Sequence, residues 1–153
     1  MNWEHLFSQA STLALLAWLL LAFGPRRYPV VPVIRLGVIG LLCVAYVPLV
    51  LVYFFRVEGG GFGTLQEVRT LFASEPVVLA GWIHYLAFDL FVGLWIAEMA
   101  DQRDWSRIIQ VPVLLATFMF GPLGLLLASA ATLVSSTQKS PLATGGSNAR
   151  DIS

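Results

Sequence analysis

Four stretches of this chain are long and apolar enough to cross a lipid bilayer, and they constrain its fold more than any other feature. They run over about residues 5–23, 32–55, 77–98 and 108–134, and each reaches the roughly 20 residues that a membrane-spanning helix needs. Composition agrees, since 58% of the 153 residues are hydrophobic and 12% are charged, which leaves too little polar surface for a soluble domain. The sequence therefore predicts an all-α protein, a four-span transmembrane helical bundle occupying residues 1–134.

The loop between the second and third spans predicts a short helix of its own, over about residues 64–75. Thr64 and Glu67 have the spacing of a capping box, in which the Thr64 hydroxyl accepts from the amide of Glu67 while the Glu67 carboxylate accepts from the amide of Thr64. The apolar residues on one side of this helix are Leu65, Val68, Leu71 and Phe72. Such a helix is expected in the membrane interface. It is either a linker that buries its apolar side or a lid hinged on residues 59–63.

Basic residues near the span ends predict the orientation. The first and third loops carry Arg26, Arg27, Arg103 and Arg107, a small majority over the opposite side, so these loops are expected in the cytoplasm and both termini outside it. No cleavage pattern follows the first span, which predicts a retained membrane helix and not a signal peptide. Arg35 is expected to snorkel to the interface and Glu98 to lie at it. Residues 135–153, rich in Ser, Gly and Thr, are expected to be a disordered polar tail.

The third span carries ionisable side chains, which are costly in hydrocarbon and therefore need an explanation. At 100° per residue, Tyr85 and Asp89 share a face that is expected to point into the bundle, at the spacing that lets a phenol donate to a carboxylate. Trp82, Gly93 and Ile96 lie on that same face. A second face carries His84, Phe88, Phe91, Trp95 and Glu98. Because His84 lies roughly 140° from Asp89, a direct hydrogen bond between them is not expected.

Two interpretations of these side chains remain open. Asp89 has no Lys or central Arg within the spans to neutralise it, so it is expected to be protonated or to face a wet cavity, where it can donate a proton. Alternatively, Asp89 and Tyr85 only fix helix register, and His84 is a structural hydrogen bonder between helices.

The fourth span is expected to bend at Pro122, which cannot continue the helical hydrogen-bond ladder. Gly121 and Gly124 allow another backbone to approach closely there. Bent helices around an acid and a histidine predict a cavity for a hydrophobic ligand, although similar bends occur in bundles that bind nothing. The candidate substrate-binding residues are Trp82, Phe88, Trp95, Thr117, Phe118 and Pro122.

Several function classes find no support in the sequence. Nine basic and nine acidic residues cancel, so no basic surface predicts a nucleic-acid partner. The single Cys43 excludes an internal disulfide and a thiolate zinc cage. Glycine fingerprints for dinucleotides, phosphate loops and haem motifs are absent, and His84 with Asp89 out of register makes a poor metal ligand set. No cofactor and no metal are expected.

The stretches "GWIHYLAFDLFVG" and "TFMFGPLGLLL" resemble the ABA4-like family, formerly a domain of unknown function. The similarity extends to "LFSQASTLALLAWLLLAFGPR" and "LQEVRTLF", covering roughly residues 6–128. Within that family a third-span His and Asp recur, which correspond here to His84 and Asp89, and a fourth-span Gly-Pro corresponds to Gly121 and Pro122. Plant members, which carry transit peptides, are linked to neoxanthin synthesis from violaxanthin. The lack of such an extension here suggests a bacterial or cyanobacterial member, which is then expected in the inner (plasma) membrane.

The resemblance implies an isomerase that turns an epoxide of a carotenoid or related isoprenoid into an allenic alcohol without net redox change. Such a reaction needs an acid and a base, and Asp89, His84 and Tyr85 are the candidate catalytic residues. The competing interpretation is a non-catalytic membrane protein that binds or scaffolds a carotenoid or lipid. A proton or small-solute pathway through Asp89 is a third. The expected partners are a hydrophobic small molecule, the membrane, and either a second copy of the chain or carotenoid-pathway enzymes.

Overall fold

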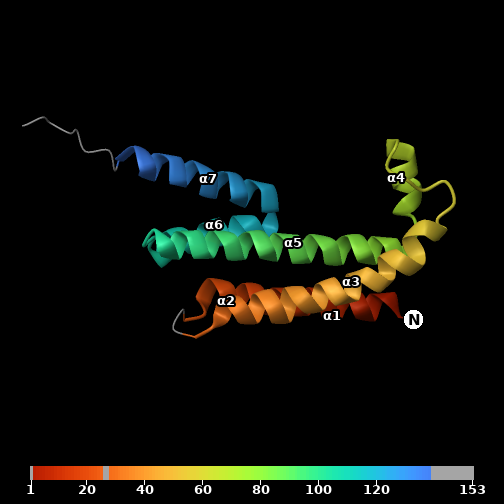
Figure 1. Ribbon diagram of the computed structural model, residues 1–153, viewed down its shortest axis with the longest axis horizontal. Helices are drawn as coiled ribbons and strands as arrows, with labels where there is room; N and C mark the ends of the chain where they lie inside the picture. Colours follow the sequence, from red (N-terminus) through yellow and green to blue (C-terminus); the bar gives the residue numbers. More distant parts are fainter. Residues whose placement is uncertain (1, 26–27, 139–153) are drawn as a thin grey trace, which may run out of the picture.

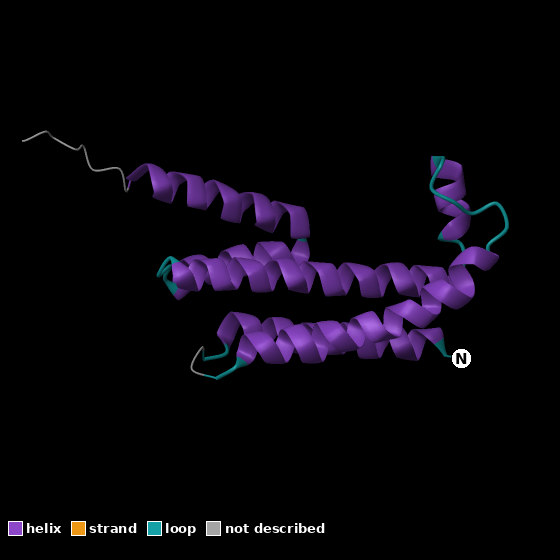
Figure 2. Ribbon diagram, viewed as in Figure 1, coloured by secondary structure: helices purple, strands orange, loops and turns teal. Residues whose placement is uncertain are grey.

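The computed structural model describes residues 2–25 and 28–138, with side chains up to residue 133, and every regular element in that part of the chain is helical (Figures 1 and 2). Three helical stretches are long and apolar enough to span a membrane: Trp3–Phe23, Val30–Arg56 and Glu75–Gln102. The first is α1 (Trp3–Phe23) and the third is α5 (Glu75–Gln102). The all-helical prediction is therefore confirmed, and three of the predicted spans correspond to helices of spanning length.

The second spanning stretch is built from several consecutive helical elements. They are α2 (Val30–Pro32), the π-helix η1 (Val33–Ile39), α3 (Gly40–Tyr53) and the 3₁₀ turn η2 (Phe54–Arg56). Arg35 lies in the π-helical segment, and its Nη2 donates to Oε2 of Glu98 on α5. Arg35 and Glu98 were each expected to lie at the water interface without a partner. In the structure they form a partly exposed ion pair that joins the second spanning stretch to α5.

α5 occupies the centre of the bundle, with α1 and α3 packed on one side of it and α6 (Arg107–Met119) on another (Figure 1). Its sequence is apolar on several faces, as expected of a helix surrounded by others. Leu90 and Leu94 of α5 are fully buried in one core cluster with Trp18 and Leu21 of α1 and Ile34 of the second stretch. A second cluster lies nearer the N-terminal end of α5, around Ile83 and Leu86.

The predicted fourth span is not one continuous helix, because the chain reverses in the middle of it. α6 ends at Met119, Phe120 leaves the helical conformation (φ −146°, ψ 67°), and α7 (Gly121–Gln138) runs back alongside α6 (Figure 1). α6 has only 13 residues, and in the described residues α7 is not among the helices long and apolar enough to span a membrane. Pro122 cannot donate within a continuous helix but is tolerated in the first turn of a new one. Gly124 then allows the close approach, since a Cβ there would overlap Thr117.

This reversal changes the expected placement of the chain ends. α1 begins at one end of the bundle, whereas α7 runs from the middle toward the opposite end (Figure 1). The expectation that both termini lie on the same side required a fourth crossing, which the described residues do not contain. α7 continues to Gln138, so residues 135–138 are helical where a disordered tail was expected. The rest of that predicted tail lies outside the described residues.

The short helix in the second loop is present as α4 (Leu65–Leu71), ending four residues earlier than expected. Thr64 Oγ1 accepts from the amide of Glu67 at 3.2 Å, which confirms half of the capping box. The Glu67 carboxylate instead accepts from the amide of Gly63 at 2.9 Å, not from that of Thr64. α4 runs across the long axis of the bundle (Figure 1). Leu71 is buried while Leu65 is exposed, so the predicted apolar side is covered only in part.

Candidate functional site

Asp89 lies near the middle of α5, directly against the tip of the α6–α7 hairpin. Gly121, the first residue of α7, is buried there, and a Cβ added to it would overlap the Asp89 carboxylate. Asp89 Oδ2 is buried and has no hydrogen-bond partner among the described residues. A buried carboxylate oxygen without a donor is unfavourable and rare in proteins; among the described side chains, Gln110 Oε1 is the only other buried polar atom without a partner.

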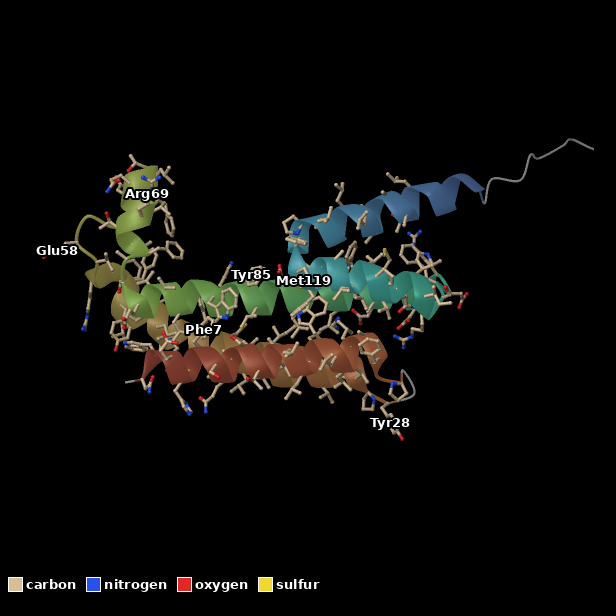
Figure 3. All side chains as sticks on the ribbon, turned by 180° about the vertical axis from the view of Figure 1, so that it is seen from behind. Phe7, Tyr28, Glu58, Arg69, Tyr85 and Met119 are labelled. Atoms are coloured by element: carbon tan, nitrogen blue, oxygen red, sulfur yellow. The ribbon has the colours of Figure 1, made fainter. Side chains whose placement is uncertain are left out.

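Tyr85 lies one helical turn before Asp89, as the spacing predicts. Its hydroxyl is close enough to interact with the carboxylate, while Oδ2 has no hydrogen-bond partner among the described residues. Figure 3 shows Tyr85 on α5 and Met119 at the end of α6 in the same part of the molecule. Asp89 therefore has a phenol beside it and the hairpin tip in front of it.

Trp82 continues the same face of α5 toward its N-terminal end. The Trp82 and Tyr85 rings are 5.4 Å apart, and Phe7 of α1 lies 5.2 Å from Trp82 on the other side. The Trp82 indole Nε1 donates to Ser11 Oγ at 2.9 Å, which orients the ring. Neither Phe7 nor Ser11 was predicted as a site residue, because only the packing of α1 on α5 brings them to this face.

His84 lies on a different face from Asp89, as the helical geometry predicts, and within the described part of the chain no hydrogen bond joins the two. The imidazole is exposed, stacks on Phe88 with ring centroids 4.4 Å apart, and lies 5.7 Å from the ring of Tyr46. Phe88 and Trp95 are also about half exposed on the outer surface of α5. The structure therefore separates His84, Phe88 and Trp95 from Asp89.

The predicted binding residues of the fourth span occupy three different environments. Thr117 is fully buried and donates from Oγ1 to the carbonyl of Val113 at 2.8 Å, so its hydroxyl is already used. Phe118 packs edge to face against Trp18, with centroids 5.5 Å apart. Pro122 is exposed. Of these residues, Thr117 and Phe118 support the hairpin tip from within the bundle.

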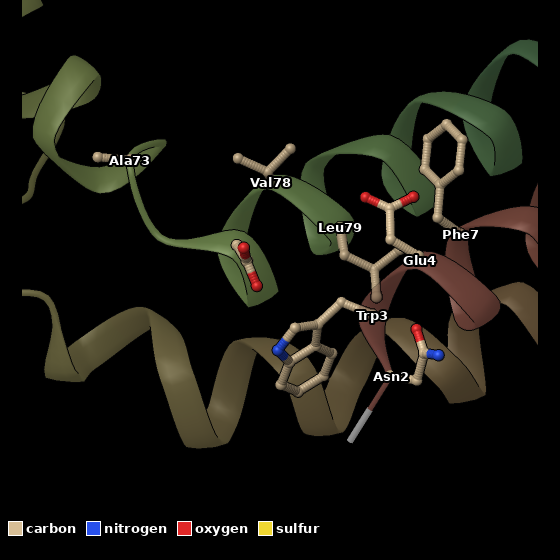
Figure 4. A pocket seen from close by; sticks show the side chains of 8 residues that line it. Asn2, Trp3, Glu4, Phe7, Ala73, Val78 and Leu79 are labelled. Carbon is tan, nitrogen blue, oxygen red and sulfur yellow. The ribbon is translucent and has the colours of Figure 1, made fainter.

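The two best-defined pockets lie away from the hairpin tip. One, of about 670 Å³, opens between the first turns of α1 and α5 (Figure 4). The other, of about 550 Å³, is an apolar groove between α1, α3 and α5. Neither is lined by Thr117 or Phe118, which were expected to border a cavity at the bend. Among the described residues, no three His, Cys, Asp or Glu side chains lie together in a group that could hold a metal ion.

One comparison with known proteins gives a match. The family model described as ABA DEFICIENT 4-like matches residues 5–127, which runs from the first turn of α1 through α6 to the first turns of α7. The searches of curated proteins and of solved structures return no match. The matched range contains Asp89, His84 and the Gly121–Pro122 pair at the hairpin tip.

Proposed function

Because this chain belongs to the ABA4-like family, we propose that it is an integral membrane isomerase that converts an epoxide of a carotenoid or related isoprenoid into an allenic alcohol. One observation carries the proposal. The Asp89 carboxylate is held in the middle of a span-length apolar helix, with one oxygen buried and lacking a partner among the described residues. A carboxyl group in such surroundings is favoured in its protonated form and can serve as a general acid.

The reaction requires one proton to be donated and one to be removed. In the proposed mechanism Asp89 protonates the epoxide oxygen, the carbon–oxygen bond on the polyene side breaks, and the oxygen becomes a hydroxyl. Loss of a proton from the neighbouring polyene carbon then leaves an electron pair that forms the new double bond of the allene. Tyr85, one helical turn before Asp89 on the same face of α5, is the candidate for positioning the Asp89 carboxyl. The isomerisation consumes no oxidant or reductant, which agrees with acid and base side chains as the only reagents.

His84 is the candidate base, and its position restricts how a substrate can lie. Its ring is on the outer, aromatic face of α5 beside Phe88, while Asp89 faces the hairpin tip. A substrate touching both groups must pass around α5 from one face to the next. The geometry therefore supports the assignment of the acid more directly than that of the base.

A non-catalytic role in binding or scaffolding a carotenoid or lipid is the second proposal. It is supported by the apolar groove of about 550 Å³ between α1, α3 and α5, whose volume lies in the range of small-molecule sites. Alanines at positions 10 and 45 line it together with leucines and Tyr53. Either role places the protein in a membrane, which we propose to be a bacterial inner membrane.

Substitution of Asp89 separates the two roles. Asp89→Asn keeps the shape but removes the acidic proton, so turnover of an epoxycarotenoid by the purified protein should fall about a hundredfold or more, with thermal stability near that of the wild type. Glu58→Gln, at an exposed loop position, is the matched control and should retain turnover. Full activity of Asp89→Asn together with loss of activity in His84→Ala would show that the acid is assigned to the wrong residue.

A further inference from the structure

α5 is covered unequally on the two sides of Asp89. The α6–α7 hairpin starts beside the C-terminal end of α5, and its tip reaches α5 at Asp89, where Gly121 meets the carboxylate (Figure 1). Near the opposite end of α5, α4 makes contact through Phe72, whose ring lies against Gly81. Asp89 itself is half-buried. Access to its carboxyl is therefore decided by the side chains that precede and follow it along the same face of α5.

The C-terminal side of Asp89 is filled by aromatic side chains. Gly93, which follows Asp89 by one turn, is buried, and a Cβ added to it would overlap the ring of Trp18 from α1. Trp18 is only 5% exposed and packs edge to face on Phe118 of α6, with ring centroids 5.5 Å apart. Ile96, the next residue on this face, is fully buried. Because close-packed interiors leave no voids of ligand size, this side of the carboxyl is closed.

The N-terminal side of Asp89 is partly open. Tyr85 and Trp82 precede Asp89 on this face, and their side chains are 37% and 36% exposed, with the two rings 5.4 Å apart. They lie on the half of α5 that the hairpin does not reach (Figure 1). Within the described part of the chain, a hydrophobic molecule can therefore approach the Asp89 carboxyl along the N-terminal half of α5 but not along the C-terminal half.

The two ends of the bundle differ in positive charge. Arg107 donates to the carbonyl of Gly24 at 3.4 Å and Arg35 donates to Glu98, so the end of α1, the start of the second stretch and the α5–α6 turn lie together. The arginines of this end are Arg35, Arg103 and Arg107, and the sequence adds Arg26 and Arg27 in the connection between α1 and α2. At the opposite end the described residues include Arg56 and Arg69. Since positive residues in short loops favour the cytoplasm, the α6–α7 hairpin enters the membrane from the cytoplasmic side.

We infer that the Asp89 site opens to the extracytoplasmic leaflet of the membrane and is closed to the cytoplasmic leaflet, so that its ligand is a hydrophobic molecule resident in the extracytoplasmic leaflet. The inference rests on the proposed function for the chemistry of that ligand and adds the side from which it enters. A molecule with a polar group must desolvate that group to cross between leaflets. The two leaflets are therefore separate sources of ligand, and the fold selects one of them.

Orientation is tested with single cysteines in the full chain, after Cys43→Ala has removed the exposed native thiol. A charged maleimide that does not cross membranes is added to intact spheroplasts. Glu58→Cys, at an exposed position in the loop before α4, should be labelled. Gln102→Cys, at the exposed end of α5, should be labelled only after the membrane is opened. The reverse pattern would overturn the inference.

Access is tested with a phosphatidylcholine that carries a photoactivated diazirine at the end of one acyl chain, near the depth of Asp89. The lipid is exchanged into the extracytoplasmic leaflet of spheroplasts or the cytoplasmic leaflet of inverted vesicles, and labelled residues are identified by mass spectrometry. Asp89 should be labelled about tenfold more from the extracytoplasmic leaflet, a preference equivalent to about 1.4 kcal/mol. Leu51 of α3 and Leu126 of α7, both exposed, verify that each leaflet is loaded.

A pair of variants tests what closes the cytoplasmic side. Trp18→Leu removes the ring that covers Gly93 and should raise labelling of Asp89 from the cytoplasmic leaflet. Phe7→Leu removes a ring of α1 on the open side and should leave that labelling unchanged. Equal labelling of wild-type Asp89 from the two leaflets, or stronger labelling from the cytoplasmic one, would overturn the inference.

Photolabelling does not depend on turnover, so the two proposals fail in different measurements. If Asp89→Asn loses turnover while wild-type Asp89 is labelled equally from both leaflets, the acid is correctly assigned and the side of entry is wrong. If Asp89→Asn keeps full turnover while labelling comes from the extracytoplasmic leaflet, the side of entry is correct and only the acid is wrongly assigned.

Discussion

Replacing Gly121 by Ala tests whether the α6–α7 hairpin tip holds the Asp89 carboxyl in place. An ideal Cβ on Gly121 would lie 2.8 Å from Asp89 Cγ and 3.0 Å from Oδ2, whereas ordinary contacts begin at 3.4 Å. Asp89 Oδ1 would be closer still, so the tip and the carboxyl must separate by about 1 Å. Overpacking of this kind typically costs about 1–3 kcal/mol. We expect that loss in the free energy of unfolding. We also expect turnover to fall by up to about a hundredfold, since displacement of a catalytic group by about 1 Å has that effect.

The control and the refuting result come from two further substitutions. Gly40→Ala introduces a Cβ that meets nothing within 4 Å and should be nearly neutral. Asp89→Ala removes the carboxyl that the new methyl group meets, so adding Gly121→Ala to it should cost little. Equilibrium unfolding in mixed detergent micelles then gives a double-mutant cycle with an expected coupling of about 1 kcal/mol or more. Simple addition of the two single effects would show that Gly121 does not contact Asp89.

Three further outcomes follow from the fold. Reporters fused before Trp3 and after Gln138 should lie on opposite sides of the membrane, because α7 turns back toward the end where α1 finishes; reporters on the same side would require a fourth crossing. Glu67→Ala should speed amide hydrogen exchange in the first turn of α4 about fivefold, since its carboxylate accepts from the loop amide before that helix; unchanged exchange would contradict the role of this contact. Glu98→Arg should destabilise the protein by up to about 1 kcal/mol and Arg35→Glu should compensate; a double variant no more stable than Glu98→Arg alone would argue against the pairing.

Local signals in the sequence were sufficient for most of the helices. Apolar runs of spanning length predict α1, the second stretch and α5, because hydrophobic length is all that a spanning helix requires. The Thr64 cap is also local, since its hydroxyl and the Glu67 amide are three residues apart. The expected hydrogen bond from the Thr64 amide to the Glu67 carboxylate was wrong. The loop before α4 folds back and brings the Gly63 amide to that carboxylate instead.

The reversal at Phe120 could not be predicted from hydrophobic length. An apolar run of 27 residues has the same composition whether it forms one crossing or two shorter helices, and a bend at Pro122 is compatible with both. Only tertiary contacts distinguish one crossing helix from two shorter helices. Gly124 packs on Thr117 and Gly121 packs on Asp89, and the second contact joins residues that are far apart in the sequence.

The polar side chains of α5 show the same division between local and long-range information. Helical geometry predicts that Tyr85 lies near Asp89 and that His84 does not, and the structure agrees with both expectations. The position of Trp82 against Ser11 and Phe7 depends on how α1 packs, which no spacing in the sequence specifies. The row of rings formed by Phe7, Trp82 and Tyr85 therefore depends on the packing of α1 against α5.

The depth of the proposed acid is set by the length of α6. α5 turns into α6 at residues 103–106, and α6 then runs back along α5 for 13 residues before it ends at Met119. Asp89 lies the same number of residues before the last residue of α5. At 1.5 Å per residue both positions are roughly 20 Å from the turn, so the hairpin tip meets α5 at the carboxyl. A helix that crossed the whole membrane would place only side chains beside Asp89, whereas a helix that ends there brings a glycine backbone against it.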